Sequence, residues 1–138
     1  MIRDKLIPML GQKYAGLGVR LGSPPDPIAI IPAKHPGVGD VSIYDDGDEA
    51  TVSIGEITHG HFNPYDATLT QEEAEAEIAG EVMGFLEDLF ADKYLLWKTR
   101  GDGGGGWQHL DYMDRPVPPR ENTDYFVWSG PYQIGATG

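Results

Sequence analysis

Residues 40–66 read DVSIYDDGDEATVSIGEITHGHFNPYD, and two turn signals divide this stretch into three segments of alternating polarity. Asp46-Gly47 follows the first segment, and an Asp-Gly pair favours a two-residue hairpin turn because both positions need a positive φ. Gly55-Glu56 separates the second segment from the third, and glycine at the first turn position favours the related type II′ turn. The stretch therefore predicts three antiparallel strands joined by two tight hairpins.

Two-residue turns also fix which residues lie opposite each other in the three strands. They place Asp45 opposite Asp48, Val52 opposite His59, and Ala50 opposite His61. Residues opposed in an antiparallel ladder share a face of the sheet. We therefore expect both histidines on the apolar face, with the two aspartates in the next row.

This stretch resembles a group of small uncharacterised bacterial proteins that share an IYDDGDE…IG…THGHFNPYD signature. The resemblance covers residues 40–66 and, less distinctly, the helix and the tryptophan-containing strand that follow. No activity is assigned to that group. The resemblance implies a single domain of bacterial type and implies no mechanism.

The composition limits the function classes open to this chain. Its 138 residues suit one domain with a hydrophobic core. Ten Lys and Arg against 22 Asp and Glu give a net charge of −12, which disfavours nucleic acid and anionic membranes and favours basic partners and metal cations. The lack of cysteine excludes disulfides and thiolate sites. Without a signal-peptide pattern or a run of about 20 apolar residues, the sequence predicts a soluble cytoplasmic protein.

The remaining segments predict two helices and further strands. A loose apolar stripe, interrupted by Pro8, predicts a short or kinked first helix, whereas Thr70 and Glu73 at capping-box spacing open a regular second one. Strands are expected at residues 28–31, 94–99, 107–112 and 125–129. The sequence thus predicts an α+β fold, in the order α-β-β-β-β-α-β-β-β, whose antiparallel sheet of five to seven strands carries both helices on one face. Residues 1–129 are expected to form one domain and residues 130–138 a mobile tail.

The histidine pair is a candidate metal or acid–base site. Residues two apart on a strand have Cα atoms about 6.5–7 Å apart, so His59 and His61 can reach one ion. Asp48 and Asp45 are the candidate third ligands, because two histidines and one carboxylate bind zinc or non-haem iron. The same carboxylates could hold His61 protonated as an acid–base catalyst. The alternative is a structural pair packed under the second helix, with no cofactor.

Aromatic and acidic side chains suggest binding surfaces. The predicted register puts Tyr44 and Phe62 together on the other face of the sheet, where exposed aromatic side chains would mark an interface. Glu87 and Asp88 oppose the dipole at the C-terminal end of the second helix, so a basic partner would explain them, and simple solvation is the alternative. The glycine-rich segment 101–106 suggests a flexible hairpin tip. The candidate contact residues are Tyr44, Phe62, Tyr65, Arg100, Trp107, Glu87 and Asp88.

These observations favour a non-enzymatic binding protein for a basic protein or a small ligand, which forms a homodimer through its aromatic sheet face. The alternative is a small metal-dependent or acid–base enzyme centred on His59 and His61, with Asp48 as the third catalytic candidate. The serines lack a nucleophile elbow, and no Lys-Ser or Lys-Thr pair follows the glycine-rich segment. Serine hydrolysis and nucleotide binding are therefore disfavoured.

Overall fold

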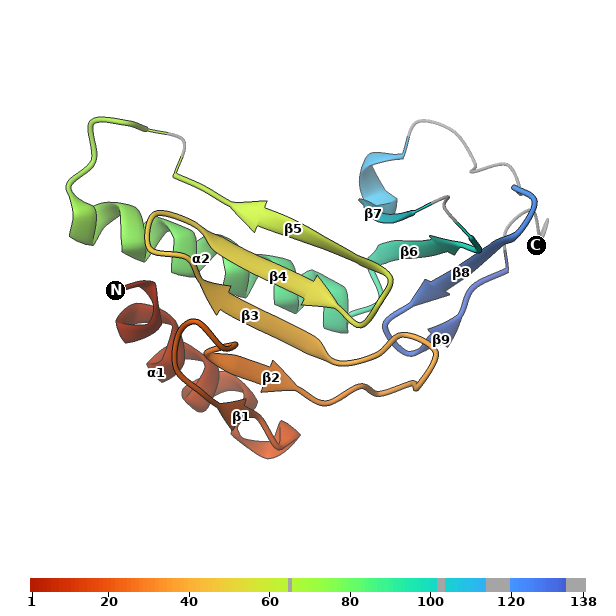
Figure 1. The fold of residues 1–138 in the computed structure, drawn as a ribbon, viewed down its shortest axis with the longest axis horizontal. Coiled ribbons are helices and arrows are strands. Elements are labelled where there is room, and N and C mark those ends of the chain that lie inside the picture. Colours follow the sequence, from red (N-terminus) through yellow and green to blue (C-terminus); the bar gives the residue numbers. More distant parts are fainter. Residues whose placement is uncertain (65, 102–103, 114–119, 134–138) are drawn as a thin grey trace.

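The computed structural model describes residues 1–64, 66–101, 104–113 and 120–133 (Figure 1). Its helices are α1 (Ile2–Tyr14) and α2 (Gln71–Phe90), and two short 3-10 helices are η1 (Ala15–Leu17) and η2 (Leu110–Tyr112). Sheet A contains, in spatial order, β1 (Arg20–Leu21), β2 (Ala29–Ile31), β3 (Val41–Asp45), β4 (Ala50–Ile54) and β5 (Thr58–Phe62). Sheet B contains, in spatial order, β7 (Gly105–His109), β6 (Tyr94–Thr99), β8 (Thr123–Val127) and β9 (Gly130–Pro131).

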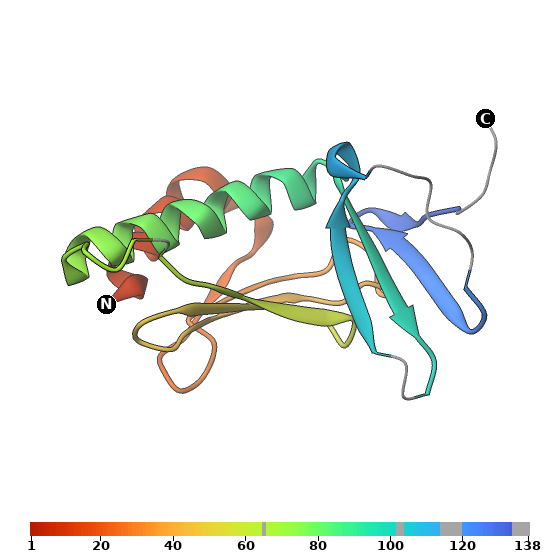
Figure 2. The ribbon, with the colours of Figure 1, turned by 90° about the horizontal axis from the view of Figure 1, so that it is seen from above.

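The predicted α+β class and the antiparallel pairing are confirmed, and the strands prove to be divided between two sheets. Both helices lie on one face of sheet A, and sheet B stands at the C-terminal end of α2 (Figure 2). The second sheet begins almost directly after α2, because the chain turns at Asp92, which has φ of 61°. The core lies between the helices and sheet A and extends toward sheet B.

The helices follow the sequence pattern that predicts them. In α1, Ile2, Leu6 and Leu10 recur every four residues and are almost fully buried, and the helix continues through Pro8. A helical residue four positions later covers the same face, so this stripe packs on α2. The capping box of α2 forms as predicted, with reciprocal bonds between Thr70 and Glu73.

The turn of the first hairpin in sheet A is two residues longer than the sequence predicts. Asp45 lies opposite Ala50, and not opposite Asp48, so residues 46–49 form a four-residue connection. The Asp45 carboxylate stabilises this turn by accepting a hydrogen bond of 2.9 Å from the backbone N–H of Gly47. Because the shift is an even number of residues, the predicted apolar residues of β3 and β4 still face the core.

The predicted register of the second hairpin is wrong by one residue. The connection contains an additional residue, Ile57, which is 4% exposed and joins the core. His59 therefore lies opposite Ser53, and His61 lies opposite Thr51. An odd shift turns every later side chain to the other face of the sheet. Both histidines consequently lie on the open face, and not on the apolar face as predicted.

Sheet B packs closely against β5, and glycines allow this approach. A Cβ at Gly60 would lie 2.5 Å from the ring of Trp107, and a Cβ at Gly105 would overlap the carbonyl oxygen of Ile57. Trp107 also packs on Phe85 of α2, with ring centroids 4.5 Å apart. The segment expected to form a flexible tip thus supplies Gly105 to strand β7 and to the contact between the sheets.

The C-terminal strands differ from their predicted bounds. β7 begins two residues before the predicted strand 107–112, and the last three residues of that predicted strand form η2. β8 begins two residues before the predicted strand 125–129. Gly130–Pro131 of the predicted mobile tail pairs with β8 as β9. Residues 134–138 of that tail lie outside the described residues.

Candidate functional site

The histidines of β5 project from the open face of sheet A. His59 and His61 are both exposed, and their ring centroids are 5.3 Å apart with the planes at 84°. Asp45 belongs to the opposite, buried face, whereas Asp48 is exposed in the turn between β3 and β4. The shift in register therefore puts the histidines and Asp45 on opposite faces, and among the described residues neither Asp45 nor Asp48 joins His61 in a group of possible metal ligands.

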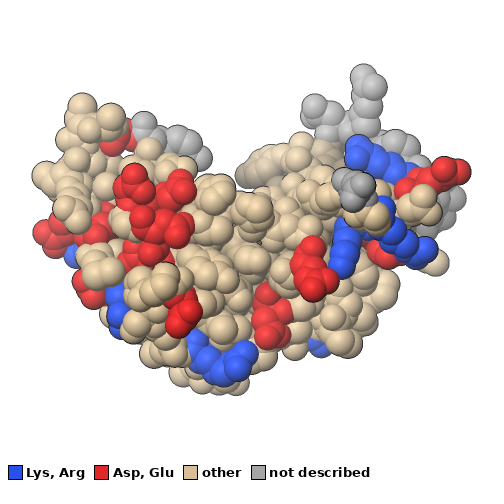
Figure 3. Space-filling model, in the orientation of Figure 1, with Lys and Arg blue, Asp and Glu red and all other residues tan. Residues whose placement is uncertain are grey.

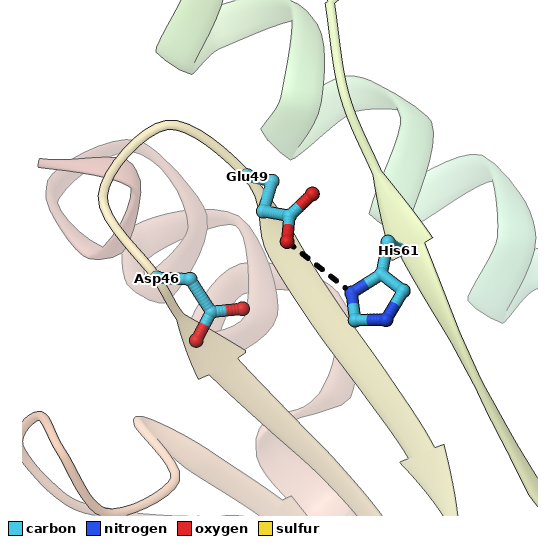
Figure 4. Close-up of side chains that lie close together, drawn as sticks. All are labelled: Asp46, Glu49 and His61. Carbon is cyan, nitrogen blue, oxygen red and sulfur yellow. Dashed lines mark ion pairs between the residues drawn. The ribbon is translucent and has the colours of Figure 1, made fainter.

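His61 instead approaches two acids that the sequence reasoning did not select. Its Nδ1 lies 3.4 Å from Glu49 Oε1, and Asp46 stands on the other side of the turn (Figure 4). One ligand atom from each of the three residues lies within 4.8 Å of the others. Thr51 completes this group, which we call the His61 cluster. Its prediction requires both turn lengths, because the four-residue turn brings Asp46 and Glu49 together, and the three-residue turn puts His61 opposite Thr51.

Hydrogen bonds within the His61 cluster indicate where the imidazole proton lies. The Thr51 hydroxyl donates to Asp46 Oδ2 at 2.5 Å and lies 3.0 Å from His61 Nδ1. A hydroxyl has one proton to donate, so its oxygen accepts a hydrogen bond from Nδ1–H. A metal ion bound at Nδ1 would therefore have to displace this proton.

Asp45 has a structural partner on the core side of sheet A. One carboxylate oxygen accepts a hydrogen bond of 3.0 Å from the backbone N–H of Arg3, in the first turn of α1. The other oxygen accepts the N–H of Gly47. The side chain is 8% exposed, and its negative charge lies beside the positive end of the helix dipole. Asp45 thus joins α1 to sheet A.

A pocket opens beside β5, between α2 and the start of sheet B, on the side where Figure 3 shows the molecular surface hollowed. Its volume is about 350 Å³. Acidic atoms gather on one flank of the hollow, over the turn between β3 and β4 and the start of α2. We call this cavity the β5 pocket, and its lining residues are Gly60, His61, Phe62, Asn63, Pro64, Glu81, Phe85, Tyr94 and Trp107.

Aromatic rings form much of the wall of the β5 pocket. Phe85 lies at their centre, with ring centroids 5.5 Å from Phe62, 4.7 Å from Tyr94 and 4.5 Å from Trp107. Burial raises the pKa of the Tyr94 hydroxyl, and the nearby carboxylate of Asp88 raises it further. Tyr94 therefore stays neutral at physiological pH and can donate a hydrogen bond.

Glu81 is the acidic group of the β5 pocket. Its side chain is half-buried, and burial, followed by repulsion from Glu77, raises the pKa of its carboxyl. Among the ion pairs in the described part of the chain, none involves Glu81. Glu77, Glu81 and Phe85 are spaced four residues apart, which is the sequence signal that could have placed them on one helix face.

The other acids near the end of α2 have partners within the molecule. Glu87 pairs with Lys13 of α1 at 3.1 Å. Asp88 lies 3.0 Å from Nε2 of the buried His109, whose Nδ1 accepts the backbone N–H of Asp111. The proton of a neutral imidazole must then lie on Nε2, where it is donated to Asp88. These contacts explain acids for which the sequence left a basic partner and simple solvation as alternatives.

The remaining predicted contact residues are divided between different parts of the surface. Tyr44 lies on the open face of sheet A, and Phe62 lies on the core face, so the two rings do not form the predicted pair. Arg100 pairs with Asp124 at 3.0 Å, which raises the pKa of its guanidinium. Tyr65 lies outside the described residues. Phe62 and the predicted Trp107 are brought together in the β5 pocket.

The raised pKa of Glu81 predicts that its negative charge lowers the stability of the free protein. A carboxyl whose pKa is higher in the folded state stabilises the fold below the pKa of the unfolded chain, and this contribution is lost as pH rises. Glu81→Gln should therefore raise the melting temperature at pH 7. The gain should disappear near pH 3.5, where the glutamate of the wild type is protonated and is as neutral as the glutamine of the variant. Thermal unfolding at the two pH values measures this difference, and equal melting temperatures at pH 7 would contradict it.

No protein-family model, curated protein or solved structure matches this chain. In the part of the chain that the structure describes, neither helix is long and apolar enough to cross a membrane.

Proposed function

We propose that this protein is a binding protein for an organic cation, which it holds in the β5 pocket. The observation that carries the proposal is the half-buried Glu81 carboxylate, which lines the same pocket as four aromatic side chains and has no ion pair among the described residues. The function is thus binding through complementary charge. It agrees with the net charge of −12.

Two physical effects favour a cation at this position. Aromatic faces attract an ammonium or guanidinium group, with a free energy of about 0.5–2 kcal/mol that increases as the cation loses water. A carboxylate within reach of the same cation adds a Coulomb attraction that is stronger in a half-buried pocket than in bulk water. Tyr94 and Trp107, which are half-buried and line the pocket, supply the first effect, and Glu81 supplies the second.

Titration with n-butyltrimethylammonium tests this function. The indole N–H resonance of Trp107, assigned with Trp107→Phe, should shift in a saturable manner. Glu81→Gln should weaken binding about tenfold, because loss of one close charge pair in a half-buried site costs about 1.4 kcal/mol.

Glu87→Gln is the matched control, since it removes a carboxylate from the same helix that is already paired with Lys13. Its affinity for the ammonium ion should equal that of the wild type. The proposal fails if the wild type shows no saturable shift, or if both substitutions weaken binding equally.

The His61 cluster supports a second candidate function, the binding of a divalent metal ion. Asp46, Glu49 and His61 offer two carboxylates and one imidazole, a donor set that suits zinc or manganese. Their ligand atoms are within 4.8 Å of one another, and small rotations of these exposed or half-buried side chains would bring them within the span of two bonds of about 2.1 Å.

Zinc titration by calorimetry distinguishes His61 from its neighbour. His61→Ala should weaken zinc binding at least tenfold by removing the only nitrogen ligand of the cluster. His59→Ala should bind as the wild type does, because His59 is not a member of the cluster. Equal affinities in all three proteins would end the metal hypothesis.

A further inference from the structure

The strand β5 has one unpaired edge in the part of the chain that the structure describes. Sheet A ends at β5, which pairs with β4 along its other edge. Proteins usually protect an exposed strand edge with lysine, proline or a bulge. Residues 58–62 contain neither lysine nor proline. Sheet B packs against the start of β5, but among the described residues no backbone hydrogen bond is formed along this edge of residues 58–62. The edge therefore offers backbone donors and acceptors to an extended segment.

The free edge of β5 runs along the β5 pocket. Five successive residues, 60–64, line the pocket together with Glu81 and Phe85 of α2. Gly60 lies opposite the buried Val52, so β5 turns this side of its chain toward α2. Any residue added opposite Gly60 would share its face. The side chain of that residue would project beside the ring of Trp107, which covers Gly60, into the pocket that Glu81 also lines.

We propose that the cation is the side chain of a lysine in an extended peptide segment, which adds to sheet A along the free edge of β5. This inference rests on the proposed cation function of the pocket and names the partner. The ammonium group binds Glu81, and the aliphatic part of the lysine covers the half-buried rings of Tyr94 and Trp107. Backbone hydrogen bonds to β5 supply affinity, and the pocket supplies specificity.

Charge favours a basic peptide over a second copy of this chain at the same edge. A second copy would bring another net charge of −12 toward Glu81 and Glu77. Juxtaposed like charges suppress association, whereas a lysine segment neutralises the pocket.

Four pentapeptides and the simple ammonium ion test the proposal. The first peptide is blocked at both ends and has the sequence Thr-Val-Lys-Val-Thr, and the second has norleucine in place of lysine. The third and fourth carry N-methyl groups on alternate amides, in the two possible registers. A strand donates through alternate amides to its neighbour, so one methylated peptide should bind at least tenfold more weakly and the other should bind like the parent.

Hydrogen exchange gives an independent measurement of strand addition. The lysine peptide should slow exchange at alternate amides of residues 58–62 at least tenfold, and n-butyltrimethylammonium should not. The norleucine peptide should bind at least tenfold more weakly than the parent, and Glu81→Gln should remove most of that difference.

The outcomes separate the two proposals. Equal binding by both methylated peptides, or equal loss in both, would overturn strand addition while leaving the cation pocket intact. Protection of the β5 edge in a dimer without peptide would overturn it in favour of a second copy. Failure of both the ammonium ion and the peptides would overturn the pocket itself.

Discussion

Gly105→Ala should lower the free energy of unfolding by about 3 kcal/mol, because the new methyl group has no space at the contact between the sheets. Its Cβ would overlap the carbonyl oxygen of Ile57 and lie 2.6 Å from that of Trp97. Both obstacles are backbone atoms, so a change of rotamer cannot relieve the clash. For a domain of this size, the melting temperature should fall by about 10 °C.

Gly84→Ala is the matched control for this substitution. Gly84 lies within α2, and a Cβ there meets no atom within 4 Å. Alanine should stabilise the helix by up to about 1 kcal/mol, since it loses less backbone entropy than glycine. Chemical denaturation of the two variants measures both changes. Equal stability of Gly105→Ala and the wild type would show that the sheets do not pack as described.

Asp45→Ala should cost about 2 kcal/mol of stability, because it removes the acceptor that joins α1 to sheet A. The backbone N–H of Arg3 would lose its carboxylate partner in a half-buried position, and the turn would lose the bond to Gly47. A lost helix cap costs about 0.5–2 kcal/mol, and an unsatisfied buried donor costs about 1–3 kcal/mol.

Asp48→Ala provides the comparison for Asp45, since it removes a nearby but exposed aspartate. Its stability should stay within about 0.5 kcal/mol of the wild type. The stability of Asp45→Asn should lie between those of Asp45→Ala and Asp48→Ala, because the amide oxygen can still accept one hydrogen bond. Denaturant titrations would contradict the structural role of Asp45 if all three variants unfolded at the same midpoint.

Local sequence signals predict the helices and strands of this fold better than they predict the register in which the strands pair. Capping by Thr70 and Glu73 depends on residues three apart, and both residues are visible in the sequence. The length of a turn depends also on distant contacts. Gly55 approaches Val38 and Gly39 so closely that a side chain there would overlap their backbone. This long-range contact accompanies the extra turn residue that the Gly-Glu signal could not reveal.

The packing of sheet B explains why the β5 pocket could be predicted only in part. Trp107 and Phe62 were selected as aromatic contacts, and both line the β5 pocket. Glu81 was one of many acids in α2, and only the packing of sheet B reveals that it borders a cavity. The sequence pattern carries no signal for the crossing of two sheets, because that crossing depends on glycines whose neighbours are distant in the chain.

The β5 pocket draws its walls from both sheets and from α2, so it is assembled only when all three are in place. A compound that binds there and not to the unfolded chain must raise the melting temperature in proportion to the logarithm of its concentration. At one hundred times the dissociation constant, the gain in free energy is about 2.7 kcal/mol. Heat denaturation of the wild type beside Glu81→Gln can therefore identify natural ligands in a collection of amines and peptides, without an assay of activity.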